Sequence, residues 1–207
     1  MDLTITKYCN IKPHKIWVNG HEVIDAGTNE SLEKSLIQSY RLLGLNYLKF
    51  FKMDNLSKLA ILATDCIVKE TELYGAADKE NTAVVFANAS SSLATDSNYQ
   101  QTINNPDNYF PSPSLFVYTL PNITIGEICI RHKIYGENVF LISRKFDADV
   151  LYFYVNELFE RTDTQNCIAG WVECNMKTYE AYLFLVEKGI GENKFETNTI
   201  NKLYKTK

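Results

Sequence analysis

The residues best placed to do chemistry lie at a corner where a short apolar run, 139–142, meets a helical pattern that begins near Asp147. A strand-to-helix corner of this kind carries a nucleophile in several α/β folds, because the first turn of the helix stabilises negative charge. The corner reads ISRKFD over residues 142–147, and we find no suitable nucleophile in it. The sequence therefore predicts the frame of a reactive corner without a reactive group on it.

Other candidate nucleophiles are poorly supported. Ser90, Ser91 and Ser92 could serve a hydrolase, but no Gly-x-Ser-x-Gly elbow surrounds them. Lys145 could form a Schiff base, but nothing nearby in the sequence indicates desolvation, and its neighbour Arg144 is also charged. Neither chemistry is favoured by the residues that flank these side chains.

The cysteines and histidines do not show the spacing of a metal site. The five cysteines are odd in number, contain no Cys-x-x-Cys pair and mostly lie in apolar runs, so we expect reduced, buried side chains. A zinc site needs clustered ligands, and the three histidines do not cluster with the cysteines. We predict no metal and no cofactor, and we place Cys129 on a buried helix face rather than as a nucleophile. The residues considered are Cys9, Cys66, Cys129, Cys167, Cys174, His14, His21 and His132.

The small polar run 88–97, NASSSLATDS, has two interpretations. Its backbone N–H groups and hydroxyls could cradle an anion. The favoured alternative is a plain connecting loop into a helix that runs through Ile103.

Composition narrows the class of protein. The 207 residues are 45% hydrophobic and 22% charged, which is ordinary for a globular domain with a sizeable core. A formal charge of −4 without a clustered basic face argues against nucleic-acid binding. No apolar run approaches the ~20 residues that cross a bilayer, and the N-terminus lacks the apolar segment of a signal peptide. We therefore expect a cytoplasmic protein with no membrane span.

Helical and strand patterns alternate along the chain. The runs 82–87 and 139–142 have the continuous apolar character of strands buried on both faces. The helix at 54–70 is apolar around more than half of its circumference, so we expect it between a sheet and a neighbour. Asn19-Gly20 predicts a hairpin turn. The predicted helices are 29–44, 54–70, one ending near 103, one within 116–134, and 147–161; the predicted strands are 15–18, 21–24, 82–87, 139–142, 167–174 and 179–186.

This alternation predicts an α/β protein with a mainly parallel sheet. The last two strands have no helix between them, so we expect them to pair antiparallel. We predict one domain over residues 1–190 and a polar tail, 191–207, that frays at its end. Gly126 costs a helix up to about 1 kcal/mol relative to alanine, and close packing against another backbone would explain it.

Three stretches resemble one known family. They are YRLLGLNYLKFFKMD at 40–54, the pair VVFAN at 84–88 with PNITIGEICIR at 121–131, and IAGWVE at 168–173. Together, in this order and spacing, they resemble the N-terminal half of the β-ketoacyl-acyl-carrier-protein synthases. The similarity covers nearly the whole chain.

The resemblance implies a thiolase-like half: a five-stranded, mainly parallel sheet in the order 3-2-1-4-5, with helices on both faces. The family joins two such halves in a chain of about double this length, so this sequence corresponds to the first half alone. It also implies that 139–142 is an edge strand that pairs antiparallel with its counterpart across a dimer axis. The edge residues are Val139, Phe140, Leu141 and Ile142.

The resemblance places the family's nucleophilic cysteine at Lys145, or at Phe146 if the register slips by one. That cysteine accepts the acyl group as a thiolate, which the helix dipole and backbone N–H groups stabilise. Neither Lys145 nor Phe146 can form the thioester. The two catalytic histidines of the family lie in the second half, and His132 lies in the wrong element to replace them. We therefore predict no catalytic residue and no 3-oxoacyl synthase activity of the chain on its own.

Three functions are compatible with this pattern. The first is a catalytically incompetent partner subunit, like a chain length factor, in fatty acid, aryl polyene or polyketide biosynthesis, where 139–142 and 147–161 would dock on a full-length ketosynthase. The second is one half of a split ketosynthase. The third is a homodimer that binds acyl chains or acyl carrier protein without chemistry. An exposed edge strand favours dimerisation in either the homomeric or the heteromeric form.

Overall fold

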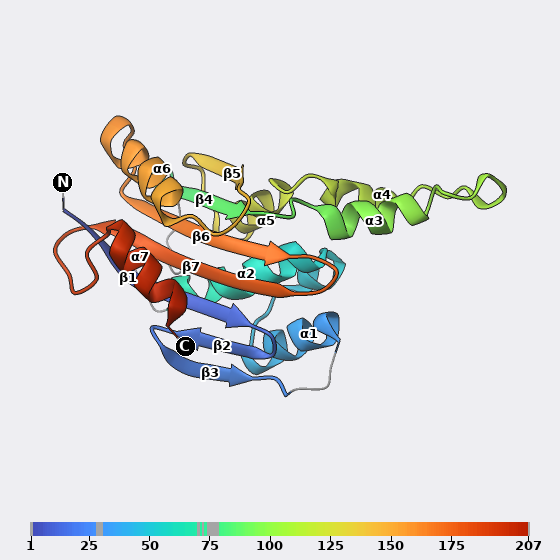
Figure 1. The fold of residues 1–207 in the computed structure, drawn as a ribbon, viewed down its shortest axis with the longest axis horizontal. Helices are drawn as coiled ribbons and strands as arrows, with labels where there is room; N and C mark the ends of the chain where they lie inside the picture. The colour runs from blue at the N-terminus through green and yellow to red at the C-terminus, as the bar shows by residue number, and fades with distance from the viewer. Residues whose placement is uncertain (1, 28–30, 70, 72, 74–78, 207) are drawn as a thin grey trace.

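The computed structural model describes residues 2–27, 31–69, 71, 73 and 79–206, which form one mixed sheet with helices on both faces (Figure 1). In these residues the sheet has seven strands in the order β3-β2-β1-β7-β6-β4-β5. The strands are β1 (Leu3–Lys12), β2 (Lys15–Val18), β3 (His21–Asp25), β4 (Thr82–Asn88), β5 (Asn138–Ile142), β6 (Asn166–Cys174) and β7 (Tyr179–Lys188). The helices are α1 (Leu32–Leu42), α2 (Asn55–Val68), α3 (Leu93–Gln101), α4 (Pro113–Phe116), α5 (Ile123–His132), α6 (Ala148–Arg161) and α7 (Thr197–Lys205), with 3-10 turns η1 (Leu48–Lys52), η2 (Pro106–Asn108) and η3 (Val117–Thr119).

Strand order departs from the prediction. β4 pairs in parallel with β5 and β6, and β7 runs antiparallel between β6 and β1. The antiparallel pairing of β6 with β7 is confirmed, but the five-stranded order 3-2-1-4-5 is wrong. The expectation of a mainly parallel sheet is wrong as well, because four of the six strand pairings in the described residues are antiparallel. The reason is the tight turn after β6, where Asn175 Oδ1 accepts hydrogen bonds from the N–H groups of Lys177 and Thr178. This turn places β7 in the middle of the sheet and leaves β1 beyond it.

The hairpin predicted at Asn19-Gly20 extends the sheet outward from β1. β2 pairs with β3 across this turn, and both turn residues have positive φ angles, 49° at Asn19 and 79° at Gly20. Such angles are those of a tight hairpin turn, in which glycine is favoured. The hairpin supplies the two additional strands that a five-stranded sheet does not have.

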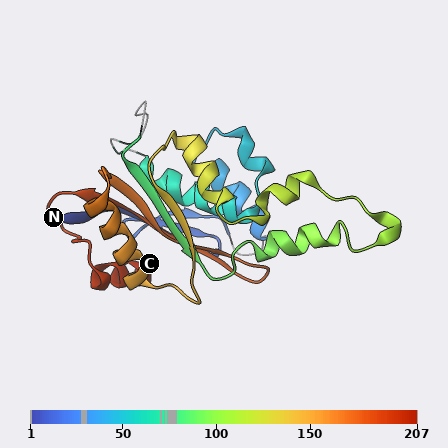
Figure 2. The same ribbon diagram turned by 90° about the horizontal axis from the view of Figure 1, so that it is seen from above.

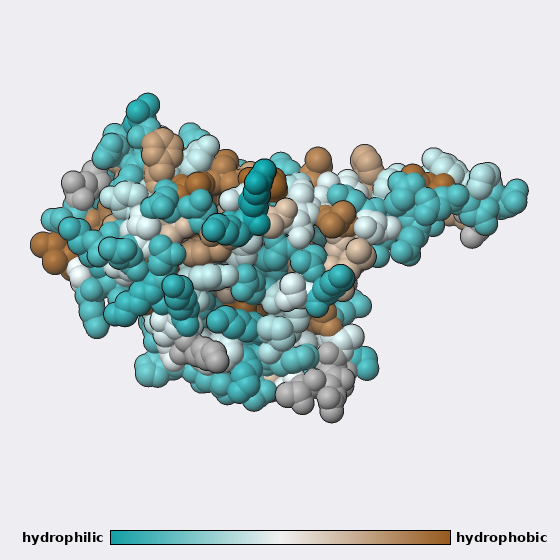
Figure 3. Space-filling view, in the orientation of Figure 1, coloured by the Kyte–Doolittle hydropathy of each residue, from teal (hydrophilic) through white to brown (hydrophobic). Residues whose placement is uncertain are grey.

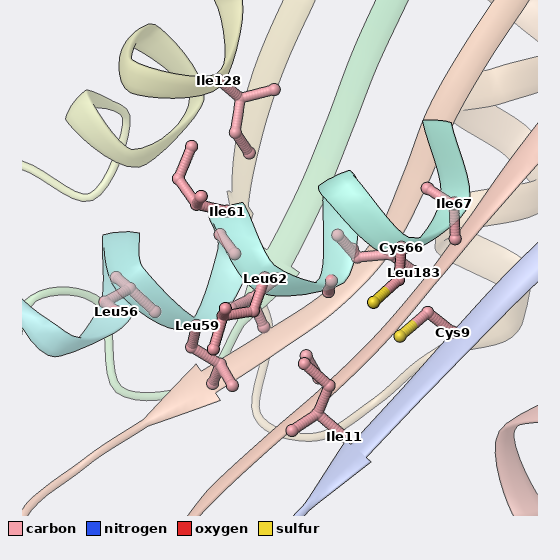
Figure 4. Close-up of a cluster of buried hydrophobic side chains, with 14 of the residues drawn as sticks. Cys9, Ile11, Leu56, Leu59, Ile61, Leu62, Cys66, Ile67, Ile128 and Leu183 are labelled. Carbon is pink, nitrogen blue, oxygen red and sulfur yellow. The ribbon is translucent and has the colours of Figure 1, made fainter. Parts of the chain in front are cut away.

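Helix α2 is the centre of the larger core. Asp54 caps it, with Oδ1 accepting a hydrogen bond from the Ser57 N–H at 2.9 Å. Its apolar residues point at β7, β1 and β6 on one side and at α5 and α1 on the other, and Leu59, Ile61 and Leu62 are fully buried (Figure 4). The prediction of a helix packed between the sheet and neighbouring helices is confirmed.

Strand β4 contributes side chains to two hydrophobic cores, one on each face of the sheet. All seven of its residues are buried. Val84 and Phe86 pack toward the α2 side, whereas Ala83, Val85 and Ala87 pack toward α6 and α7. Figure 2 shows the two helical layers on opposite faces of the sheet. The prediction of a parallel strand covered on both faces is confirmed.

Two local expectations are wrong. Strand β5 is not buried: its middle residues are half-buried and its end residues exposed, because it pairs only with β4 in the described part of the chain. Gly126 meets no atom within 4 Å of an added Cβ, so no close backbone packing explains it. The polar tail contains α7, whose Ile200 and Leu203 are buried against the sheet, and fraying at its end stays a prediction. The domain boundary at residue 190 stays a prediction.

An arm projects from the end of the sheet at which β4 ends. It consists of α3, the segment 102–112 and α4, and it stands away from the body in both views (Figures 1 and 2). Phe110, near its tip, is 74% exposed. Among the described residues, no helix combines the length and the apolar character needed to cross a bilayer.

Candidate functional site: the β5–α6 corner and the sheet edge

Two local sets of hydrogen bonds hold the corner after β5. The Ser143 N–H donates to the Asn88 carbonyl at 2.8 Å, which holds the first residue after the strand against β4. Asp147 then caps α6, with Oδ1 accepting from the N–H groups of Asp149 at 3.0 Å and Val150 at 3.2 Å. These are the amides that a helix N-terminus would otherwise offer to an external anion. The chain's own carboxylate therefore occupies the anion-binding position of the corner.

Phe146 fills the inner side of the corner. Its ring stacks on Tyr204 of α7, with centroids 3.9 Å apart, and lies edge-on to Tyr182 and Trp171 at 5.8 and 6.3 Å. We call these four rings the aromatic corner: Phe146, Trp171, Tyr182 and Tyr204. Glu180 Oε1 accepts hydrogen bonds from the Tyr204 hydroxyl at 2.8 Å and from Trp171 Nε1 at 3.1 Å. Glu180 thus satisfies the polar atoms of Tyr204 and Trp171, whereas the buried Tyr182 hydroxyl has no hydrogen-bond partner.

Lys145, the other position that the resemblance indicates, is exposed. Burial, followed by its hydrogen bond to Glu180, raises the pKa of the Tyr204 hydroxyl, so this phenol is not an acid-base group at neutral pH. Nothing in the sequence around Phe146 announces its contact with Tyr204, because the two residues are far apart in the chain and meet only through α7.

The loop 89–92 does bind an anion, but one from its own chain. Glu173 Oε2, at the end of β6, accepts hydrogen bonds from the N–H groups of Ala89 at 2.8 Å and Ser90 at 3.1 Å. Asn88 Oδ1 accepts from the Ser91 N–H at 2.9 Å, and Ser91 has a φ of 50°. Both interpretations of 88–97 are therefore partly right: it is a connecting loop into α3, and its amides cradle a carboxylate.

Ser92 and His132 lie in different networks. Ser92 Oγ donates to the Thr119 carbonyl at 2.7 Å. His132 Nε2, at the end of α5, lies 3.0 Å from Asp65 Oδ1 of α2. The histidine therefore serves the α2–α5 contact and does not reach the β5–α6 corner, as expected from its place in the sequence.

Asp65 also anchors Arg131, in an ion pair that sequence inspection missed. Arg131 donates from Nε and Nη2 to the two carboxylate oxygens at 2.8 and 2.6 Å, and its guanidinium lies over the Tyr47 ring. Burial alone would raise the pKa of Asp65, but the contacts with His132 and Arg131 lower it on balance. The sequence signal is a carboxylate near the end of a largely apolar helix.

All five cysteines are free thiols. Four are buried and Cys129 is half-buried, so the expected burial is confirmed for all but Cys129. Burial raises the pKa of Cys129 to about 11 and that of Cys174 to about 12. Both are therefore thiols rather than thiolates at neutral pH. Over the described residues, no group of three potential metal ligands comes together.

The edge strand and its surroundings form an apolar surface. β5 is confirmed as an edge strand, and at its end Ile142 is 57% exposed. On the neighbouring helix α6, Phe153 is 58% exposed, and Tyr152 and Tyr154 beside it are also accessible. Figure 3 shows hydrophobic side chains gathered along the side of the molecule on which β5 and α6 lie. We call this region, comprising β5, Tyr152, Phe153 and Tyr154, the edge surface.

Solved structures with the same fold are ketosynthases and their partners. The chain aligns over 94% of its length with the ishigamide ketosynthase/chain length factor, at a TM-score of 0.64 and 15% identity. It aligns over 99% with a chain of a ketosynthase in complex with its chain length factor from Xenorhabdus doucetiae, at 0.61 and 14%. A type II polyketide synthase ketosynthase in complex with its acyl-carrier protein aligns over 90% of the chain, at 0.63 and 10%. The chain therefore has the ketosynthase and chain length factor fold that its sequence resembles.

The lengths of these proteins differ from one another. The chain spans 64% of the first structure's chain and 62% of the third's, but 92% of the second's. No family model and no curated protein matches the sequence.

Proposed function

We propose that the chain is a non-catalytic partner subunit of a ketosynthase, comparable to a chain length factor, in cytoplasmic fatty acid, aryl polyene or polyketide biosynthesis. The observation that carries this proposal is the closed corner between β5 and α6. An acyl thioester needs a thiolate there and free N–H groups for the oxyanion. This chain has an exposed Lys145, a stacked Phe146 and a carboxylate, Asp147, on the helix amides.

Electrostatics support the same conclusion. The Asp147 carboxylate would repel both a thiolate and a developing oxyanion at this position. An ammonium group such as that of Lys145 near a helix N-terminus is opposed to the helix dipole. The corner therefore favours neither formation of an acyl enzyme nor stabilisation of a tetrahedral intermediate.

The edge surface is the part of the chain proposed to dock. An unpaired edge strand offers a row of N–H and C=O groups to an antiparallel partner strand. The apolar side chains beside it, Ile142 and Phe153, would be removed from water at the same time. The ketosynthase and chain length factor complex of Xenorhabdus doucetiae supports a heteromeric partner of this kind.

Co-expression with each full-length ketosynthase encoded in the same genome tests the proposal. We expect a stable complex by affinity capture and by light scattering after gel filtration. Ile142→Lys and Phe153→Lys place charges in the apolar contact and should each abolish the complex. Val23→Lys on β3 is the matched control, because Val23 is exposed on the opposite edge of the sheet. It should leave the complex intact.

A chemical assay distinguishes the enzyme alternatives. The isolated chain is incubated with malonyl- and acyl-carrier protein, and mass spectrometry follows acyl adducts and longer products. We expect neither. An adduct on the isolated chain would contradict the proposal and support half of a split synthase. A homodimer that binds acyl carrier protein but no ketosynthase would support the third hypothesis.

A further inference from the structure

Two cysteines from different elements face each other in the larger core. Cys9 comes from β1 and Cys66 from the last turns of α2, and their sulfur atoms point toward one another where the helix crosses the strand (Figure 4). Both belong to the same hydrophobic cluster. Burial raises the pKa of the Cys9 thiol, and the adjacent Cys66 side chain raises it further.

Access to the two sulfurs is unequal. Cys9 has no exposed surface, whereas Cys66 is 7% exposed and lines a cavity of about 400 Å³. The cavity lies between the β2–β3 hairpin and the end of α2. Its wall combines apolar and charged side chains, including Val18, Val23, Leu45, Lys7, Lys69 and the acidic Asp65. A small uncharged oxidant can therefore reach Cys66 from the cavity but not Cys9.

We propose that Cys9 and Cys66 are a peroxide-sensitive dithiol that closes to an internal disulfide between β1 and α2. In the first step the Cys66 sulfur attacks one oxygen of hydrogen peroxide, the O–O bond breaks, and the departing hydroxide takes the thiol proton as water. This step leaves a sulfenic acid on Cys66. In the second step the Cys9 sulfur attacks the Cys66 sulfur, and the hydroxyl leaves with the Cys9 proton as a second water.

The unequal burial assigns the two roles. Cys66 is the thiol that meets the oxidant, and Cys9 is the resolving thiol, held protonated until the sulfenic acid forms beside it. Closure would join residues 57 positions apart in the sequence and fix the end of α2 to the sheet. Constraining a loop of this length restricts the unfolded chain, which stabilises the folded protein. A thiol reductant reverses the change.

Stepwise hydrogen peroxide treatment of the full chain, followed by denaturation, alkylation and peptide mapping, tests the inference. In the wild type we expect two fewer alkylated thiols, a linked pair of peptides containing Cys9 and Cys66, and a rise in Tm of about 5 °C that dithiothreitol reverses. Cys9→Ala should instead accumulate sulfenic and sulfinic acid on Cys66. Cys66→Ala should leave Cys9 alkylatable at the same peroxide dose.

Cys129→Ala is the control, because Cys129 is the most accessible cysteine and lies on α5. It should form the same linked peptides as the wild type. Over-oxidation of Cys66 in the wild type without a link to Cys9 would overturn the inference, and so would a link that involves Cys129 or a second molecule. Persistence of both free thiols after Cys129 has been oxidised would overturn it as well. Thermal melts of each reduced variant show that it is folded before treatment.

Discussion

At the β5–α6 corner, the side chain of Phe146 determines how much space the site leaves open. Its ring lies flat on Tyr204 and joins α7 to the strands that carry Trp171 and Tyr182. A small polar residue at this position would leave an opening lined by aromatic rings, whereas phenylalanine closes it. The same residue therefore fills the corner and secures the C-terminal helix.

Phe146→Ala should destabilise the protein by about 2 to 3 kcal/mol, because the substitution removes a stacked, half-buried ring and leaves a cavity. Urea unfolding followed by tryptophan fluorescence measures the loss, since Trp171 lies in the same cluster. Phe153→Ala is the control: its ring is mostly exposed, so the midpoint should barely move. Equal losses in the two variants would contradict the packing role of Phe146.

Asp65→Asn should lower stability at neutral pH by about 3 kcal/mol, because Arg131 would lose the charge that compensates it. The folded-state pKa of Asp65 is lowered, so its contribution is present above the unfolded value of about 3.9 and is lost as pH falls through the lower folded value. The gap between wild type and variant in urea midpoints should therefore narrow from pH 7 to pH 3. The exposed Asp163→Asn should show little gap at either pH. A gap that stays constant with pH would exclude this linkage.

At the scale of single residues, the sequence predicts which residue types a site lacks better than it predicts which side chains are in contact. A missing cysteine at 142–147 can be seen by inspection. Inspection of the sequence does not reveal the stack of Phe146 on Tyr204 or the hydrogen bonds of the loop amides to Glu173. Each of these contacts joins residues from distant parts of the chain. Non-local contacts of this kind leave no spacing pattern to detect.

Elements with a local pattern were predictable. Helix α2 and strand β4 have apolar positions on more than one face, and burial on those faces follows directly. The order of the strands in the sheet was not predictable, because it depends on which strands pair after long connections. Helix α7 escaped prediction since only a few of its residues are apolar, yet Ile200 and Leu203 fall on the one face that covers the sheet.

Two glycines, one in a strand and one in a helix, differ in the space that a larger side chain would find. At Gly170 in β6, an added Cβ would meet the Tyr182 carbonyl oxygen of β7 at 2.0 Å, at a φ of 149°. Gly170→Ala should therefore push β6 and β7 apart and cost several kcal/mol, at least about 3. In α5, where the Cβ at Gly126 meets nothing, Gly126→Ala should stabilise the protein by about 0.5 to 1 kcal/mol. Thermal melts measure both, and a destabilising Gly126→Ala would reveal a contact that the backbone does not show.

For the whole molecule, the sheet has two very different edges. The β3 edge carries charged side chains, with Lys15 of β2 paired to Glu22 and Asp25 at 2.9 and 3.0 Å. Charges of this kind discourage pairing with another chain. The β5 edge instead has an exposed Ile142 at its end, and the helix that follows it in the chain, α6, carries the exposed Phe153. This asymmetry would direct the proposed association to the β5 side of the sheet. It follows from the three-dimensional arrangement and not from any one segment.

Association through the edge surface should depend little on salt, because the proposed contact buries apolar groups and backbone hydrogen bonds rather than ion pairs. Calorimetric titration of this chain into the proposed ketosynthase partner should give a negative heat-capacity change, which accompanies apolar burial. Raising the ionic strength from about 0.05 to 0.5 M, a range over which screening shortens the reach of surface charges several-fold, should change Kd by less than about threefold. Because Arg144 and Lys145 lie beside this edge and are exposed, the variant Arg144→Ala with Lys145→Ala separates their contribution. If salt raised Kd tenfold for the wild type but not for this variant, the result would contradict the prediction. It would show that the positive charges of the corner, and not the apolar strand and helix, hold the partner.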